Sequence, residues 1–402
     1  MTVRLIHGDM REKLAELVDA SVDAIVTDPP YHLTTGKKGG SGAASLNENS
    51  PAGRSRIGTG FMGMRWDGGD IAMQLATWAL LLRVAKPGAH LLVFSSSRTF
   101  HRVWTAVEDA GWEIRDTLMW LHGEGFPKSS NQEGAWKGWG TALKPAFEPI
   151  LLARKPLIGT VAENLQAHRV GALNIDACRI AGAAGSGVWG SSNKTCQDGR
   201  MFNASPSGEE YRSESHQAGR WPANVLHDGS EEVVGMFPQS AGAQGDVRGN
   251  EPSEPLGENT YGRMAGRVPF AVRGDTGSAA RFFWCPKASK RDRNDGLQGM
   301  PRQAVNWSSG EQSPGTFQSP NTDRENENFH PTVKPTELMA YLCRLVTPPE
   351  GMILDPFMGS GSTGKAAFGA GYSFVGIEID ERYIEIARRR IVGVAPLFAE
   401  VQ

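Results

Sequence analysis

Cysteine is scarce in this chain, which has four among its 402 residues. Cys178, Cys196, Cys285 and Cys343 form no CxxC pair, so their spacing excludes the common zinc sites and provides no disulfide framework. Unpaired thiols are typical of a reducing compartment. We therefore predict a cytoplasmic protein without a bound metal.

Hydrophobic runs long enough to cross a bilayer are also missing. There is no run of about 18 or more apolar residues, so we predict no transmembrane helix. The N-terminus carries acids and lacks a long apolar core, which excludes a secretory signal. The formal net charge is −2, so a surface that binds nucleic acid needs its positive charge concentrated locally.

Two polar motifs that follow apolar runs carry most of the information. The first is Asp28-Pro29-Pro30-Tyr31, directly after the strand-like run 24–27. Each proline fixes φ and lacks an N–H donor, so the neighbouring carbonyls should stay out of strand pairing. A carboxylate, carbonyls and an aromatic ring form an acceptor cluster that suits a planar ring bearing an NH2 group. Taken alone, the motif is equally well explained as a proline-rich turn.

The second motif is an apolar run that ends in Asp355 and passes through Gly359 and Gly361 into a helix-like stretch. Glycines let a backbone approach a ligand closely, and a helix N-terminus offers free N–H groups. Glu378 follows Asp355 by 23 positions. An offset of about 20 is typical of an acid that meets a nucleoside ribose in doubly wound folds. The pattern predicts a nucleoside-cofactor half-site, and the GxGxxG at 359–364 leaves a dinucleotide-dependent oxidoreductase as an alternative.

Together the two motifs resemble those of the amino-group DNA methyltransferases that use S-adenosyl-L-methionine. The catalytic motif precedes the cofactor motif, which is similar to the β-type order of that family. The resemblance covers roughly residues 1–155 and 328–395. It implies a doubly wound, mostly parallel, Rossmann-like α/β sheet, and methyl transfer to the exocyclic amine of a base flipped out of double-stranded DNA.

The resemblance also implies the catalytic roles. The Asp28 carboxylate and the Pro29 carbonyl accept the two N–H groups of the amine, Pro30 keeps the turn rigid, and Tyr31 stacks on the base. Asp in the first position favours adenine N6, and cytosine N4 is the alternative. No Pro-Cys pair occurs, so the nucleophile that methylation at a ring carbon requires is missing.

The cofactor residues implied by the resemblance are Asp9, Thr332, Lys334, Asp355, Phe357, Gly359, Gly361 and Glu378. In this set Asp9 meets the adenine amine, Glu378 meets the ribose, and Thr332 or Lys334 meets the methionine carboxylate. Asp9 also fits a plain helix N-cap.

The middle of the chain differs in composition. Between about 182 and 329, Gly, Ser, Asn, Asp and Pro dominate and apolar periodicity nearly vanishes. We predict a catalytic half at 1–155, an inserted, loop-rich target-recognition region at 156–329 and a cofactor-binding half at 330–402. Five basic residues are candidates for phosphate contacts, with a solvated charge run as the alternative: Arg281, Lys287, Lys290, Arg291 and Arg293.

Periodicity predicts alternating strands and helices in the outer parts of the chain. The expected strands are 3–7, 22–27, 89–95, 112–121, 147–153 and 372–380, and the expected helices are 10–19, 71–85 and 98–111. Strand order cannot be read from these patterns. A non-catalytic DNA-binding module and an enzyme acting on RNA or protein are further alternatives. A partner restriction endonuclease and a homodimer are left open.

Overall fold

The structure, a computed structural model, has two compact units. The described residues are 1–31, 70–123, 125, 129, 131–180, 187–188, 212–213, 219–239, 277–283, 292–304, 325–330 and 332–394. The first unit comprises 1–177, 224–230 and 285–402, and the second comprises 178–223 and 231–284. The second unit is thus shorter than the predicted insertion at 156–329.

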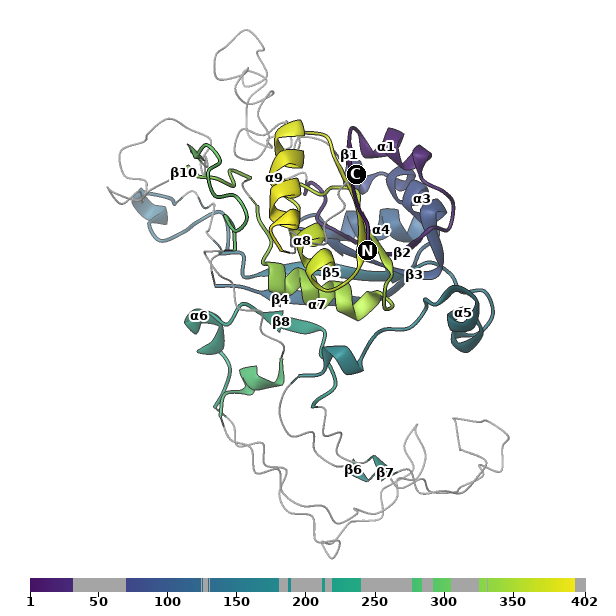
Figure 1. Ribbon diagram of the computed structural model, residues 1–402. Helices are drawn as coiled ribbons and strands as arrows, with labels where there is room; N and C mark the ends of the chain where they lie inside the picture. The colour runs from purple at the N-terminus through teal and green to yellow at the C-terminus, as the bar shows by residue number, and fades with distance from the viewer. Residues whose placement is uncertain are drawn as a thin grey trace, which may run out of the picture. The chain divides into compact units, whose positions relative to one another are not determined.

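An eight-stranded sheet forms the centre of the first unit (Figure 1). Its strands, in spatial order, are β1 (Val3–His7), β12 (Ser373–Glu378), β11 (Met352–Asp355), β2 (Val22–Thr27), β3 (Ala85–Phe94), β5 (Phe147–Arg154), β4 (Glu113–Leu121) and β8 (Val225–His227). The first five run parallel, and β5 is antiparallel to both of its neighbours. β8 is parallel to β4.

Helices cover both faces of this sheet, with α7, α8 and α9 on one side and α1, α3 and α4 on the other (Figure 1). Their bounds are α1 (Met10–Lys13), α3 (Leu75–Val84), α4 (Phe100–Asp109), α5 (Val161–His168), α7 (Thr336–Val346), α8 (Ser362–Gly369) and α9 (Glu381–Val392). A mostly parallel sheet between two helical layers confirms the predicted α/β, doubly wound fold class.

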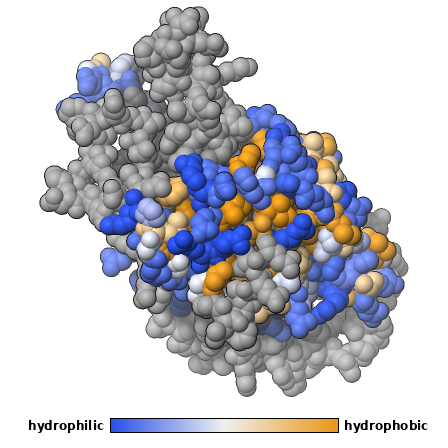
Figure 2. Space-filling view, turned by 45° about the horizontal axis from the view of Figure 1, so that its top comes forward, coloured by the Kyte–Doolittle hydropathy of each residue, from blue (hydrophilic) through white to orange (hydrophobic). Residues whose placement is uncertain are grey.

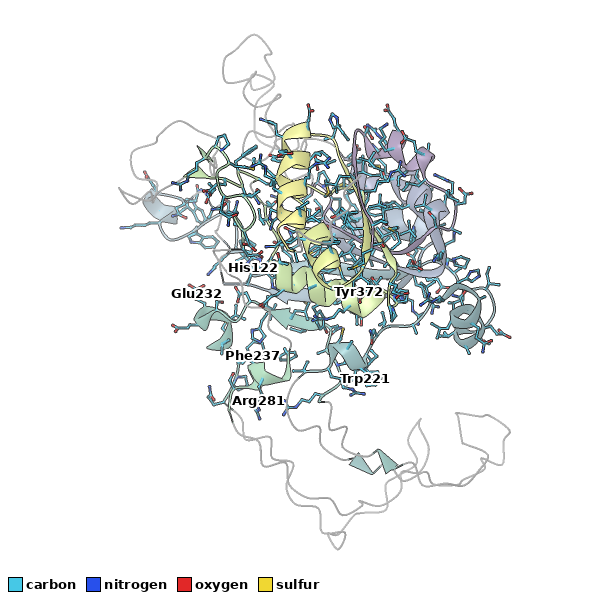
Figure 3. The ribbon with its side chains drawn as sticks, viewed as in Figure 1. His122, Trp221, Glu232, Phe237, Arg281 and Tyr372 are labelled. Carbon is cyan, nitrogen blue, oxygen red and sulfur yellow. The ribbon has the colours of Figure 1, made fainter. Side chains whose placement is uncertain are left out.

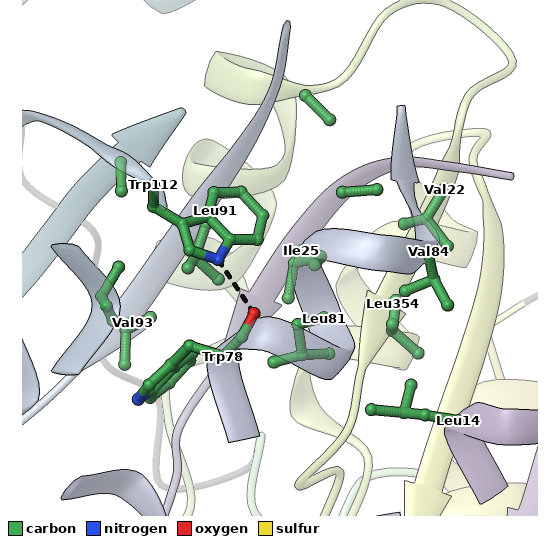
Figure 4. Packing of buried hydrophobic residues seen from close by; sticks show 14 of the residues in the cluster. Leu14, Val22, Ile25, Trp78, Leu81, Val84, Leu91, Val93, Trp112 and Leu354 are labelled. Carbon is green, nitrogen blue, oxygen red and sulfur yellow. Dashed lines mark hydrogen bonds between the residues drawn. The ribbon is translucent and has the colours of Figure 1, made fainter. Parts of the chain in front are cut away.

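A hydrophobic core lies between the sheet and the layer that contains α3 and α4. Trp78 and Leu81 of α3 and Leu91 of β3 are fully buried there. The indole N–H of Trp112 donates to the carbonyl of Trp78 at 3.1 Å (Figure 4), so both rings pack without leaving a buried donor unpaired. All six residues of β2 are buried, as expected for a central parallel strand.

The predicted strands 3–7 and 22–27 are confirmed as β1 and β2. The predicted helix 10–19 is too long, because α1 ends at Lys13 and a 3-10 turn, Leu14–Glu16, follows it. Leu17 is extended, with ψ 141°, and the guanidinium of Arg83 donates to the carbonyls of Leu14 and Leu17 at this ending. The strand expected to begin at Ala89 begins at Ala85, directly after α3.

The second unit contains short elements held by aromatic and cationic side chains. Phe237 and Phe283 have ring centres 5.3 Å apart, and the Arg179 guanidinium lies 5.5 Å from the Trp221 ring. Arg281 belongs to this unit, and Figure 3 labels it with Phe237 and Trp221. The described elements include α6 (Glu231–Val234) and a 3-10 turn, Ala279–Phe282. In this unit at least some of the aromatic residues have a packing role.

No helix in the described ranges is long and apolar enough to span a membrane. On the face seen in Figure 2, hydrophobic residues are interspersed with hydrophilic ones over the described part of the surface.

Candidate active site

The candidate site begins where β2 ends. The chain leaves β2 at Thr27 and enters the motif 28–31 beside β11, the parallel neighbour of β2. Carboxyl ends of parallel strands share one edge of a sheet, so Asp355 and Glu378, at the ends of β11 and β12, lie on that edge as well. Thr27 Oγ1 donates to Asp355 Oδ1 at 2.7 Å. The structure therefore brings the two sequence motifs together within the first unit.

Four residues, which we name the Lys334 cluster, meet around one ammonium group at this edge: Asp28, Tyr31, Glu148 and Lys334. Lys334 Nζ lies 2.8 Å from Asp28 Oδ2 and 3.0 Å from Glu148 Oε2. The same Nζ donates to the Tyr31 hydroxyl at 3.2 Å, and that hydroxyl donates to Glu148 Oε2 at 3.1 Å. The ammonium also lies 4.9 Å from the centre of the Phe94 ring, a favourable cation–π distance.

One atom of the Lys334 cluster is left unpaired. Asp28 Oδ1 is buried and accepts no hydrogen bond from any residue that the structure describes. A buried acceptor without a donor costs roughly 1–3 kcal/mol, so a ligand donor at this position would recover that cost. Burial raises the pKa of Asp28 above its ordinary value, Lys334 opposes the rise and Glu148 adds to it.

The charges of the other two groups follow from their surroundings. Burial opposes the charged form of Lys334, but Asp28 and Glu148 outweigh it and raise the pKa of the ammonium. Burial, with the negative charges of Asp28 and Glu148, raises the pKa of Tyr31 well above its ordinary value. The cluster thus holds a charged lysine and a neutral phenol.

Asp355 organises the loop that joins β11 to α8. Its Oδ1 accepts from Thr27 Oγ1 and from the Phe357 backbone N–H at 3.1 Å, and its Oδ2 accepts from Thr363 Oγ1 at 2.6 Å. Burial raises the pKa of Asp355 to about 7 although these donors oppose the shift. Both oxygens are already occupied, so the geometry indicates a role in shaping the loop. The Phe357 ring packs against the core cluster.

The loop glycines are explained by packing. Gly361 has φ +79° and caps α8, and a Cβ there would lie 2.7 Å from the Cβ of Ala387 in α9. A Cβ on Gly359, at φ +54°, would lie 2.9 Å from His330 Nε2. Glu378 accepts from the Gly359 N–H at 2.8 Å and from the Asp380 N–H at 2.9 Å, and burial raises its pKa. The glycines let the loop pass between α9 and the segment that carries His330.

The structure places Asp9 at the N-cap of α1. Its Oδ1 accepts from the Arg11 N–H at 2.9 Å, and its carboxylate pairs with the Arg11 guanidinium, which lowers the pKa of Asp9. The Thr332 carbonyl lies 3.1 Å from His330 Nδ1. Burial lowers the pKa of His330 to about 3, so this ring is neutral.

The candidate phosphate-contact residues fall into two groups. Arg281 Nη1 donates to the carbonyls of Gly277 and Ser278 at 2.6 and 2.8 Å. Arg293 Nη1 donates to the His330 carbonyl at 2.7 Å. Both guanidinium groups thus support their own backbone. The other three candidates lie outside the described residues: Lys287, Lys290 and Arg291.

The sequence analysis did not identify Glu148 or the ion pairs of Lys334. Glu148 lies at the start of β5, whose antiparallel pairing with β3 brings it to the edge where Asp28 lies. The only local signal was the stretch 144–149, in which an acid stands between prolines at the start of a strand. Lys334 was expected at the methionine carboxylate, whereas its ammonium lies among the side chains of the catalytic motif. Among the residues described, no group of His, Cys, Asp or Glu side chains could hold a metal ion.

Comparison with known proteins includes a family match over most of the chain. A family model described as DNA methylase matches residues 22–389. The Type II methyltransferase M.HinfI of Haemophilus influenzae is 35% identical over 74 residues, which are 18% of this chain and 21% of that protein. The Type II methyltransferase M.HindIII of Haemophilus influenzae is 35% identical over 107 residues, 23% of this chain and 35% of that protein.

The chain thus spans about a fifth to a third of the length of these two curated relatives. Among solved structures, the PvuII DNA methyltransferase (cytosine-N4-specific) aligns with 97% of this chain and 86% of its own, at 12% identity and a TM-score of 0.44.

Proposed function

Because the chain belongs to the DNA methylase family, whose model matches residues 22–389, we propose that it methylates the exocyclic amine of a DNA base. The proposed methyl donor is S-adenosyl-L-methionine, and the proposed target is adenine N6. Asp28 at the first position of the motif favours adenine, and cytosine N4 is the alternative target.

The unpaired Asp28 Oδ1 is the observation that carries this proposal. An exocyclic amine is a poor nucleophile, because its lone pair is delocalised into the ring. If Asp28 Oδ1 and the Pro29 carbonyl each accept one N–H, the nitrogen becomes more tetrahedral and its lone pair turns out of the ring plane. Tyr31 stacks on the base and fixes its orientation. The rate then comes from positioning and electrostatic preorganisation.

The cofactor site fits the carboxyl edge beside the Lys334 cluster. S-adenosyl-L-methionine supplies an electrophilic methyl group on a sulfonium. Several acids gather at this edge, including Asp28, Asp355 and Glu378, which suits a cationic ligand. Asp9 accepts from the adenine amine, Glu378 lies at the ribose, and Thr332 remains the candidate for the methionine carboxylate. Gly359, Gly361 and Phe357 shape the loop against which the cofactor lies.

The DNA partner enters the proposal through geometry and charge. An amine inside a duplex cannot reach Asp28, so the base must be flipped out of the helix. Lys287, Lys290 and Arg291 are the proposed phosphate contacts, with Arg281 and Arg293 as weaker candidates because they already support backbone carbonyls. The second unit is the proposed target-recognition region.

The test is methylation-aware sequencing of DNA from a host that expresses the chain, with an Asp28→Ala variant as control. We expect N6-methyladenine in one sequence context and none with the variant. N4-methylcytosine would select the alternative base. Unmodified DNA, together with a larger thermal shift from NAD than from S-adenosylhomocysteine, would contradict the proposal and favour the oxidoreductase alternative.

A further inference from the structure

Glu148 is the one acid of the Lys334 cluster to which no role has been given. It lies at the start of β5, and its Oε2 receives two donors, the Lys334 ammonium at 3.0 Å and the Tyr31 hydroxyl at 3.1 Å. Its side chain is 24% exposed, so these contacts are partly shielded from water. Asp28 Oδ2 shares the same ammonium at 2.8 Å.

The number of charges in the cluster matters for Asp28. Two carboxylates share one ammonium, so the cluster carries a formal charge of −1 when Tyr31 is neutral. Without Glu148, Asp28 and Lys334 would form an electrically neutral pair. Without Lys334, two carboxylates would face each other in a partly buried pocket, where like charges disfavour the ionised form. With both Glu148 and Lys334 present, Asp28 remains ionised and its negative charge is not fully neutralised.

We propose that Glu148 is a positioning residue for methyl transfer: by sharing the Lys334 ammonium it leaves Asp28 negatively charged toward the substrate amine, and by accepting from the Tyr31 hydroxyl it fixes the ring that stacks on the base. This inference rests on the proposed function, and it adds Glu148 and Lys334 to the groups that set the rate of methyl transfer.

The physical reason lies in the charge that develops on the substrate. In the proposed transfer the amine nitrogen would gain a bond to the methyl carbon while the carbon–sulfur electron pair stays on sulfur as a neutral thioether. The nitrogen would be positively charged until one of its protons passes to the Asp28 carboxylate or to water. A preorganised negative charge beside that nitrogen stabilises the transition state more than the neutral amine of the ground state. The ammonium of Lys334, held between two acids, cannot cancel the charge of Asp28 completely.

The proposal predicts opposite effects for two substitutions. Lys334, which precedes α7, is faced by Asp28 and Tyr31 from the loop after β2 and by Glu148 from β5. Asp355 of β11 also lies at this edge, and the charge of Asp28 contributes to the raised pKa of Asp355. Glu148→Gln removes a negative neighbour, so the pKa of Asp28 falls and the acidic limb of the rate profile moves to lower pH. Lys334→Met removes the positive neighbour, so the same limb moves to higher pH.

The plateau rate should also fall in Glu148→Gln, since Lys334 then neutralises Asp28. We expect a loss of roughly tenfold to a hundredfold in kcat, less than the hundredfold to thousandfold typical of a direct preorganised contact. The KM for S-adenosyl-L-methionine should change less than the kcat, because Glu148 acts on the amine and the base. Glutamine is isosteric and still accepts from the Tyr31 hydroxyl, so the fold is kept.

The experiment measures kcat and KM of the full chain against pH for the wild type, Glu148→Gln, Lys334→Met and the control Glu113→Gln. Glu113 is a comparable acid of the same sheet, paired with Arg154 at 2.6 Å away from the cluster, and its variant should keep the wild-type acidic limb. Far-UV circular dichroism and a thermal melt check the folding of each variant.

Opposite displacements of the acidic limb, with a reduced plateau in Glu148→Gln, support the inference. An unchanged kcat and limb in folded Glu148→Gln, or displacements of both variants in the same direction, overturn it. Failure of the proposed function looks different, since the wild type itself then transfers no methyl group to any DNA amine.

Discussion

The cofactor-loop glycine Gly361 offers a sharp test of why the loop has its shape. Its φ of +79° lies in the left-handed region, and a Cβ would lie 2.7 Å from the Cβ and 2.8 Å from the Cα of Ala387. Gly134 is a matched control, because it has φ +63° and nothing described within 4 Å of an added Cβ. Gly361→Ala and Gly134→Ala therefore share the backbone strain and differ in the collision with α9.

The expected magnitudes follow from three contributions. The left-handed conformation costs a non-glycine residue about 1–2 kcal/mol. Alanine lowers the entropy of the unfolded chain, which offsets this by about 0.4–1 kcal/mol. Overpacking against α9 adds about 1–3 kcal/mol, and the backbone Cα of Ala387 cannot move aside as a flexible side chain would. By these principles we expect stability to fall by about 1–5 kcal/mol for Gly361→Ala and by about 0–2 kcal/mol for Gly134→Ala, and the difference between the two is the overpacking contribution.

Urea unfolding of both variants without ligand, followed by far-UV circular dichroism, measures this difference. S-adenosylhomocysteine affinity is then measured by calorimetry under conditions in which both variants are folded. If the two variants are equally destabilised while only Gly361→Ala binds the ligand more weakly, the glycine is required by the ligand and not by α9, and the packing explanation is refuted.

Three further predictions concern the acids and the basic run. Burial raises the pKa of Asp355 from its ordinary 3.8 to about 7, so the fold binds this proton more tightly than the unfolded chain does, and the stability it confers is lost as pH rises through that interval. As pH rises from 3.8 to about 7, the melting temperature of Asp355→Asn should therefore fall less than that of the wild type. Parallel curves of melting temperature against pH would contradict a raised pKa for Asp355. Asp9→Ser keeps an N-cap, so it should retain the stability of the wild type but bind S-adenosylhomocysteine more weakly. Asp9→Ala should bind it more weakly and also be destabilised by about 0.5–2 kcal/mol. Unchanged affinity in Asp9→Ser would show that Asp9 acts only as an N-cap. Replacing Lys287, Lys290 and Arg291 by uncharged residues should reduce the slope of log affinity against log salt by about 0.9 for each phosphate contact that is lost. An unchanged slope in a DNA-binding titration would exclude these residues from phosphate contact.

The local sequence was sufficient to predict the bounds of a strand that is buried on both faces. All six residues of β2 are buried, and this central strand coincides with the predicted run 22–27. The helix predicted at 10–19 is wrong beyond Lys13, where the Leu14 carbonyl accepts from the Leu17 N–H and from Arg83, 69 positions later in the chain. Interactions between residues so far apart leave no trace in a local hydrophobic pattern.

The same limit explains the site. The two motifs could be paired from their apolar runs, because parallel strands place their carboxyl ends at one edge. Glu148 could not be found in this way, since it lies in an antiparallel strand whose neighbours, β3 and β4, are set by the whole sheet. For Lys334 the sequence indicated a place near the ligands, while its partners depended on where β5 lies.

The most direct measurement of the central claim is methyl transfer by Asp28→Asn with its cofactor affinity measured in parallel. Purified wild type and variant are given DNA and methyl-labelled S-adenosyl-L-methionine, the nucleosides are resolved by mass spectrometry, and S-adenosylhomocysteine binding is measured by calorimetry. We expect labelled N6-methyladenine from the wild type, a rate at least about a hundredfold lower in the variant, and closely similar affinities. Transfer by Asp28→Asn at the wild-type rate would contradict the claim that the Asp28 carboxylate holds the amine.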